Sequence, residues 1–416
     1  MVAVTSDRFL DLARAAAIVA CVGLLYSPSV GTIGLITTYV AFVLSGQAWT
    51  RMTALLARPA VYWGLAFLGV VIMGTVYASV PWAERWTDVY KWRTILWFIV
   101  LLAIFDDPRW GARLMAVFVL GAAVGVVWSD AVAAGWLSFK REPQEVLRNA
   151  GTQGMAFACA ALVCLWAVLE KQSLAGLPSW VWSVVAAACV ANIVFITNAR
   201  SGYALLAVGS CLLLGWRASW QRRVIIVAGV LLLGGMAFAV SERMQAKVTA
   251  GLVEWNHAST SEVETSFGSR RVFYANSWDI YRDHWLIGVG TGGFALAYRT
   301  QIAGQYPDGD WHGRPTTDPH NQYLSVAIQQ GAIGLVVFCV WILAMVRAKD
   351  GQAQRHRLAV ALLAGWCVTS LFSSHFRTFV EGHILTTFLG VLLAVPRPSV
   401  PLPERCLHEA SSGDNA

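Results

Sequence analysis

The chain carries little charge. Asp, Glu, Lys and Arg make up 13% of its 416 residues, hydrophobic residues make up 57%, and the mean hydropathy is +0.56. A soluble globular domain has roughly 25% charged residues, so the composition argues against one and indicates a protein that crosses a membrane several times. The net charge of +7 does not point to nucleic acid, because Lys and Arg gather in the cytoplasmic loops of membrane proteins.

Cysteine is missing where a disulfide would matter most. Seven of the eight cysteines lie in apolar runs, and Cys406 lies near the C-terminus. None lies within 242–319, the longest polar stretch, so no disulfide can cross-link it, and we interpret the cysteines as packing residues. The sequence also lacks an internal repeat and an evident signal-peptide cleavage site, so the first apolar run is expected to stay as a helix.

Apolar runs follow one another along the chain, and a run of about 20 residues can cross roughly 30 Å of hydrocarbon. We therefore predict an all-α polytopic membrane protein with about twelve transmembrane helices, nine within 1–241 and three within 320–396. Between them, residues 242–319 form one large loop, and 397–416 form a polar tail. The predicted spans are 9–26, 31–49, 60–80, 91–106, 112–134, 151–169, 180–197, 202–216, 222–241, 320–346, 356–373 and 379–395.

The distribution of basic residues predicts the orientation. Lys and Arg are about twice as frequent in one set of alternating short loops as in the other. This bias places both termini in the cytoplasm and the long loop on the outer face, which for a bacterial inner membrane is the periplasm. ATP and nucleotide sugars are absent there. A group transfer at the loop would therefore need a donor that was activated beforehand, typically one linked to a lipid.

The end of the loop holds the main candidate for a catalytic base. Asp318 suits an N-cap and Pro319 the first helical position, which would place His320 in the first turn of the next membrane helix. A helix start favours a nearby anion and disfavours imidazolium, so His320 would stay neutral. The alternative is that His320 and Asn321 only cap the helix. Weaker candidates for site residues are His257, His284, His312, His375 and Asp130.

An aromatic stripe in the loop predicts a helix. Its members recur at intervals of three or four residues, which is one face of a helix, and we expect this amphipathic helix to lie along the membrane interface. Arg270 and Arg271 lie at its start, where a guanidinium could bind a phosphate through two N–H groups or bind lipid headgroups. The stripe consists of Tyr274, Trp278, Tyr281 and Trp285.

Two more arginines lie at outer ends of predicted membrane helices. Arg200 is in a very short turn between two apolar runs, and Arg148 directly precedes another run. Charge at the bilayer boundary is costly and is often functional, although both side chains could simply anchor their helices. Several cations that meet on one face would suit a diphosphate.

Two other motifs suggest chemistry less strongly. The glycine-rich stretch 288–293 lacks the preceding strand and the spacing of a nucleotide-binding loop, so we interpret it as a turn. Asp308 and Asp310 could hold a divalent metal, but the neighbouring Pro307 and Gly309 favour a turn here too. We therefore predict no metal site and no cofactor.

The order of the loop motifs resembles the O-antigen ligase/polymerase superfamily. The resemblance covers about residues 266–340, and the twelve-span layout extends it over the chain. The sequence departs from many members at Trp285, where they have proline. The motifs are Gly268-Ser269-Arg270, Leu286-Ile287-Gly288-Val289-Gly290, His320-Asn321-Gln322-Tyr323-Leu324 and Gly331-Ala332-Ile333-Gly334-Leu335.

This resemblance implies an inverting, metal-independent glycosyltransferase. The donor would be an O-antigen linked to undecaprenyl diphosphate, and for a ligase the acceptor would be lipid A–core. By position, His320 would serve the acceptor hydroxyl, and Arg200 and Arg270, or Arg271, would bind the diphosphate. Arg148 would be a weaker member of that set. Asp318, Asn321 and Tyr274 would support the site.

Other functions remain open at this point. An O-antigen polymerase would use a second lipid-linked glycan as acceptor, and a protein O-oligosaccharyltransferase would use a protein side chain. The single large late loop favours a ligase. A transporter would place polar residues at the membrane midplane, whereas here they gather at one face. A non-catalytic scaffold is a further alternative.

Overall fold

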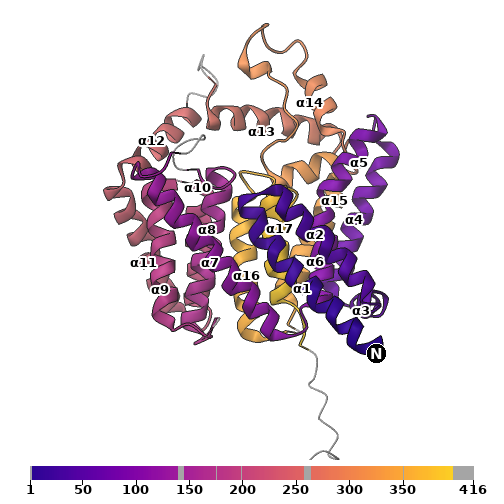
Figure 1. Cartoon of the computed structure of the whole chain (residues 1–416). Helices are drawn as coiled ribbons and strands as arrows, with labels where there is room; N and C mark the ends of the chain where they lie inside the picture. Colours follow the sequence, from indigo (N-terminus) through magenta and orange to yellow (C-terminus); the bar gives the residue numbers. More distant parts are fainter. Residues whose placement is uncertain are drawn as a thin grey trace, which may run out of the picture.

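Long helices stand side by side in a bundle, and three further helices lie across one end of it (Figure 1). The structure is a computed structural model that describes residues 2–138, 145–174, 176–197, 199–256, 264–349 and 351–396, and within these ranges the chain forms helices and no strand. We call the end that carries the three helices the loop end. The start of α1 lies at the opposite end (Figure 1). The three helices are α12 (Glu242–Asn256), α13 (Ser266–Asp283) and α14 (Phe294–Ile302).

Seven helices of the described chain are long and apolar enough to span a membrane, and an eighth span results if the bent pair α2 (Pro28–Leu44) and α3 (Ala48–Leu55) counts as one. The protein is therefore a multi-pass helical membrane protein. The count of twelve spans stays a prediction. The seven helices are α1 (Val2–Tyr26), α4 (Pro59–Tyr77), α7 (Pro108–Ala133), α8 (Ala150–Leu169), α9 (Ser179–Asn192) with the π-turn Ile193–Thr197, α11 (Trp220–Val240) and α15 (Gln322–Arg347).

The other five predicted spans are also helices, but they have 12 to 17 residues. They are α2, α6 (Arg93–Ile104), α10 (Arg200–Gly215), α16 (Ala353–Thr369) and α17 (Phe379–Leu392). In α6, α10, α16 and α17 a terminal residue lines the same pocket at the loop end. The sequence did not predict the short helices α3 and α5 (Trp82–Lys91).

Helix α15 is broken at Gly331, which has φ +66° and ψ −168°. The glycine-rich segment 288–293 fills the break as a turn, with positive φ at Gly288, Gly290 and Gly292. Its amides donate to carbonyls that the break leaves free: Val289 N–H to Ile328 O at 2.8 Å, and Gly290 N–H to Gln329 O at 3.0 Å. Buried backbone groups need such partners. The segment therefore supplies hydrogen-bond donors to the backbone of an interrupted membrane helix.

The long loop contains more structure than predicted. The aromatic stretch does form a helix, α13, but α12 and α14 accompany it. The buried face of α13 also differs from the predicted stripe: Phe273 and Ile280 pack with α14 and α15, while Trp278 is 54% exposed. Asn276 of α13 is also buried, and its side-chain amide bonds the hydroxyl groups of Tyr298 and Tyr306.

Candidate functional site

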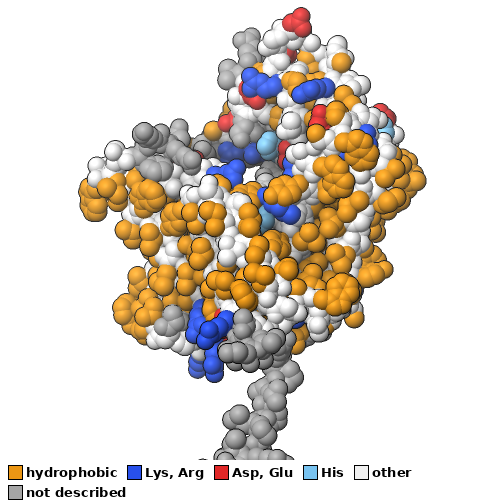
Figure 2. Space-filling view, turned by 45° about the vertical axis from the view of Figure 1, so that its right-hand side comes forward, with side chains coloured by type: hydrophobic (Ala, Val, Ile, Leu, Met, Phe, Trp, Pro, Cys, Tyr) orange, Lys and Arg blue, Asp and Glu red, His pale blue; other side chains and the backbone are white. Residues whose placement is uncertain are grey.

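A pocket of about 1240 Å³ opens at the loop end of the bundle. Figure 2 shows basic and histidine side chains in a recess between the loop and the apolar sides of the bundle. Seven basic and three acidic side chains line the pocket, so it is suited to an anionic ligand. The basic residues are Lys91, Arg93, Arg148, Arg200, Arg243, Arg270 and Arg377, and the acidic ones are Glu254, Asp318 and Glu381.

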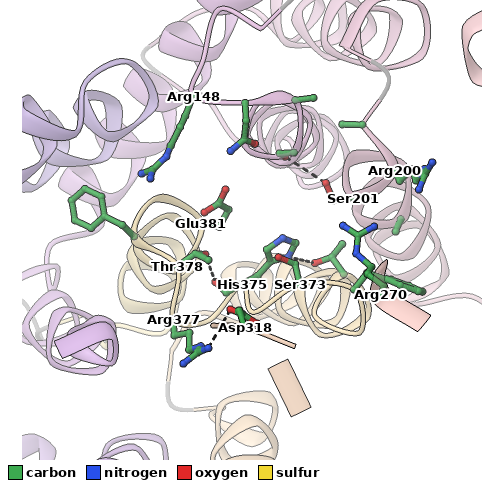
Figure 3. Close-up of a pocket in the computed structure, with 18 of the residues that line it drawn as sticks. Arg148, Arg200, Ser201, Arg270, Asp318, Ser373, His375, Arg377, Thr378 and Glu381 are labelled. Carbon is green, nitrogen blue, oxygen red and sulfur yellow. Dashed lines mark hydrogen bonds and ion pairs between the residues drawn. The ribbon is translucent and has the colours of Figure 1, made fainter. Parts of the chain in front are cut away.

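The pocket brings together three of the four predicted phosphate-binding arginines. In Figure 3, Arg200 and Arg270 lie on one side, Arg148 lies on the other, and His375 and Glu381 lie between them. Arg148, Arg200 and Arg270 come from three segments that are far apart in the sequence. Arg271 is exposed and does not line the pocket. The geometry therefore favours Arg270 over Arg271 as a pocket residue.

Each of these three arginines lies at a helix start. Arg200 is the first residue of α10, and Arg270 is in the second turn of α13, which Thr265 caps by accepting from Gly268 N–H. Arg148 directly precedes the N-cap of α8, where the Asn149 side chain accepts from Thr152 N–H at 2.8 Å. Helix starts also present free N–H groups. The pocket therefore combines guanidinium groups with helix N-termini, both of which favour anions.

The turn before α15 differs from the prediction. The helix begins at Gln322, and Asn321 is its N-cap, accepting from Leu324 N–H at 3.0 Å. The expected helix start at Pro319 with Asp318 as cap is wrong, because His320 adopts a left-handed conformation (φ +55°) that ends any helix begun earlier. The Asp318 carboxylate instead accepts from His320 N–H at 2.8 Å, which holds this strained turn.

His320 lies beside the pocket and is not among its lining residues. Its ring stacks on Phe273 with 6.0 Å between ring centroids. The Tyr274 hydroxyl lies 3.1 Å from the His320 carbonyl oxygen and 2.9 Å from that of Leu371, so Tyr274 holds this segment against the end of α16. Asp318, which binds the His320 backbone, does line the pocket.

The surroundings of His320 favour its neutral form. Burial lowers the pKa of His320, the Asp318 carboxylate raises it, and the guanidinium groups of Arg270 and Arg377 lower it again, with a net decrease. From the sequence we expected the dipole of a helix start to keep the His320 imidazole neutral. The described cause is instead burial and neighbouring positive charge.

A buried ion cluster joins three separate segments at the wall of the pocket. Arg377, just before α17, donates to Asp88 of α5 at 3.1 Å and to Asp318 at 3.2 Å. Lys91 also binds Asp88 at 2.5 Å. Burial raises the pKa of Asp318, but Arg377 and the Ser374 hydroxyl lower it more, so this carboxyl stays ionised. The cluster fixes Asp318, and through it the turn that carries His320.

Sequence reasoning missed Glu381 and gave His375 little weight, yet both line the pocket. Glu381 lies in the first turn of α17 and accepts a hydrogen bond from the Thr152 hydroxyl of α8. His375 is buried, and its Nδ1 lies 3.0 Å from the Thr369 hydroxyl. A carboxylate at the start of a predicted membrane helix was the signal that could have identified Glu381.

The remaining candidates lie elsewhere. Asp310 caps a short 3₁₀ turn and binds the ring of His312 at 2.6 Å, so this carboxylate has a structural partner. His284 and Asp130 do not line the pocket. His257 and the predicted tail 397–416 lie outside the described residues.

The fold and the pocket define a multi-pass helical membrane protein with a cationic site at one end, beneath a helical loop. Residues 185–339 match the family model described as O-antigen ligase, and this match supports the O-antigen ligase superfamily. The matched segment contains Arg200, Arg270 and His320, whereas Arg148 and Glu381 lie outside it. No curated protein matches the chain.

Proposed function

We propose that the protein is an O-antigen ligase. It would transfer an O-polysaccharide from undecaprenyl diphosphate to a sugar hydroxyl of lipid A–core, at the periplasmic face of the bacterial inner membrane, with both termini in the cytoplasm. The observation that supports this most is the meeting of Arg148, Arg200 and Arg270 in one pocket at the end of the membrane helices. A diphosphate attached to a membrane lipid would reach such a place with its glycan outside the bilayer.

In this mechanism the acceptor hydroxyl oxygen attacks the anomeric carbon of the donor from the side opposite the diphosphate. The new glycosidic bond forms as the bond to the diphosphate oxygen breaks, and the leaving undecaprenyl diphosphate keeps the electron pair. His320 takes the hydroxyl proton, for which its lowered pKa keeps it in the basic form. The attack inverts the anomeric centre.

The arginines would stabilise the leaving group. Arg200 and Arg270 lie on the same side of the pocket, with Arg148 opposite, so a diphosphate between them would face guanidinium groups from two directions. Fixed positive charge at the position where negative charge develops lowers the barrier. The arginines would supply the neutralisation that a divalent metal provides in many glycosyltransferases, so we propose a metal-independent reaction.

Because His320 lies beside the pocket and His375 and Glu381 line it, the identity of the base needs a direct comparison. The test uses a strain that lacks its O-antigen ligase, complemented with wild type, His320→Ala, His375→Ala or Glu381→Gln at equal membrane levels. On a lipopolysaccharide gel, His320→Ala is expected to abolish capped product. Full capping by His320→Ala would contradict its role as the base, and loss only in the other two variants would transfer that role to them.

The acceptor is tested by reconstitution. Purified protein receives lipid-linked O-glycan, with or without lipid A–core. Product that depends on lipid A–core is the result expected of a ligase. Chain extension without it would identify a polymerase, and glycan attached to an added acceptor protein would identify a protein O-oligosaccharyltransferase. Transfer that requires a divalent metal would contradict the arginine mechanism.

A further inference from the structure

Gln153 connects two walls of the pocket without lining it. It lies in the first turns of α8 and is completely buried, with 0% of its surface exposed. Its Oε1 accepts from Leu147 N–H at 3.0 Å. Its Nε2 donates to the Thr197 hydroxyl at 2.7 Å and to the Ser129 hydroxyl at 3.2 Å. One amide thus holds the segment before α8, the π-turn at the end of α9 and the helix α7.

The partners of Gln153 are close to two pocket arginines in sequence. Leu147 directly precedes Arg148, and Thr197 comes three residues before Arg200. The bond to Leu147 N–H fixes the backbone directly before Arg148, and the bond to the Thr197 hydroxyl holds the π-turn that leads into Arg200. The Gln153 amide therefore restrains the positions of both arginine-bearing segments. It does so at the same time for Arg148 and for Arg200, which line the pocket.

Close packing makes this connection rigid. A Cβ at Gly154 would lie 2.3 Å from the Cβ of Ala199, and one at Gly202 would lie 2.9 Å from the Gly154 carbonyl oxygen. The Ser201 hydroxyl also bonds the Gly151 carbonyl at 3.4 Å. The starts of α8 and α10 therefore touch backbone to backbone, beside the Gln153 amide.

The hydrogen bonds around Gln153 continue to a carboxylate. The Thr197 hydroxyl donates to the Asn192 side chain, whose Nδ2 donates to Asp130 at 2.6 Å. Thr197 therefore uses its proton on Asn192 and accepts from Gln153. Only a side chain that both accepts and donates can serve Leu147 and Thr197 together. A buried network of this kind specifies one arrangement when all its members are satisfied.

We propose that Gln153 is a positioning residue that sets the separation of Arg148 and Arg200, and so the fit of the pocket to a lipid-linked diphosphate. This inference rests on the proposed diphosphate-binding function. The amide touches no ligand and acts only through the two arginine-bearing segments.

The test replaces Gln153 with Met, which keeps the length of the side chain and removes its hydrogen bonds. The probe is farnesyl diphosphate, a short polyprenyl diphosphate, titrated into full-length purified protein in detergent. We expect Gln153→Met to weaken binding roughly tenfold, a size seen for coupled neighbouring residues. In the ligation assay it should raise the donor KM more than it lowers kcat. Thr197→Val, which removes the other partner, should act in the same direction.

Two controls separate positioning from general stability. Thr387→Val removes an equally buried hydroxyl that accepts from Trp97 at 2.8 Å, away from the pocket, and should leave probe binding unchanged. In a background that carries both Arg148→Ala and Arg200→Ala, Gln153→Met should weaken binding by much less than tenfold, because its effect passes through these two arginines. If Gln153→Met does not fold, Thr197→Val and its combination with Arg200→Ala give the same comparison.

The outcomes also separate this inference from the proposed function. If neither wild type nor Arg200→Ala binds the probe, the diphosphate site itself is refuted. If Arg200→Ala weakens binding but Gln153→Met does not, only the positioning role is refuted. Equal losses on Gln153→Met with and without both arginines would also overturn it, since they would show an effect independent of Arg148 and Arg200.

Discussion

The break in α15 gives the sharpest stability prediction. Gly331 has φ +66° and ψ −168°, a region that is essentially restricted to glycine. Replacing it with Ala should destabilise the protein strongly and should reduce activity, because the half of α15 before the break follows directly from Asn321 and the turn at His320.

The size of the effect follows from two terms. Holding Ala in this backbone region costs about 1–3 kcal/mol. The new Cβ would also lie 2.2 Å from the Leu286 carbonyl oxygen, so that contact must open. It carries two hydrogen bonds, from Ala332 N–H to Trp285 O at 2.7 Å and from Ile333 N–H to Leu286 O at 3.3 Å, each worth about 1 kcal/mol. We therefore expect a loss of about 3–5 kcal/mol in the free energy of unfolding.

The assay is unfolding in detergent micelles by titration with a denaturing detergent, followed by tryptophan fluorescence. The matched control is Gly69→Ala in α4, where an added Cβ meets no heavy atom within 4 Å. Ala is a better helix former than Gly by about 1 kcal/mol, so the control should be neutral or stabilising. If the free energy of unfolding of Gly331→Ala lies within about 1 kcal/mol of that of the control, the glycine turn does not stabilise the break in α15 as described.

Three further results are expected. Burial and the positive charge of Arg270 lower the pKa of His320, so kcat/KM should fall only below the usual imidazole pKa of about 6.5. Arg270→Gln removes the charge and should move the midpoint of this pH profile upward, whereas Arg270→Lys keeps the charge and should not. An unchanged midpoint in Arg270→Gln would contradict the assignment of His320 as the base. Arg270→Ala should raise the donor KM at least tenfold, whereas Arg271→Ala, which changes an exposed side chain, should behave as wild type. Equal effects of the two substitutions would refute the assignment of Arg270 over Arg271 as the residue that binds the donor. Arg377→Met should cost about 3–5 kcal/mol of stability, because it leaves the buried Asp318 carboxylate without its arginine and Asp88 with Lys91 alone. A double variant that also carries Asp318→Asn should recover part of this loss in the same unfolding assay.

The sequence predicted the helical class, the apolar runs and the position of the aromatic helix, because these depend on local composition and spacing. It did not predict which face of α13 is buried. The aromatic stripe was the more obvious apolar face, but Phe273 and Ile280 pack against α14 and α15. The periodicity of the sequence does not reveal which face of a helix packs against distant segments. The predicted spans 91–106 and 379–395 are longer than the helices α6 and α17, because hydropathy does not detect where the helical backbone ends.

The candidate arginines could be named from their places at helix ends. That Arg148, Arg200 and Arg270 line one pocket depends on how distant segments meet, which no local pattern contains. The cap of α15 was mislocated because Asp318 and Pro319 form a good local helix start, whereas Arg377 and Ser374 bind Asp318 from elsewhere in the fold. Glu381 was missed for the same reason: its partner Thr152 is 229 positions away.

The glycine turn also constrains the order in which the protein can mature. The Thr291 hydroxyl donates to the carbonyl of Val71 at 2.5 Å, and the Thr291 amide donates to that of Gly74 at 3.0 Å, across 220 positions of the chain. At about 5–20 residues per second, a ribosome needs about 10–45 seconds to make that stretch. Until then the end of α4 lacks these two hydrogen bonds. The turn at 288–293 can make these contacts with α4 only after residue 291 has been synthesised, so this part of the fold forms when most of the chain has already been made.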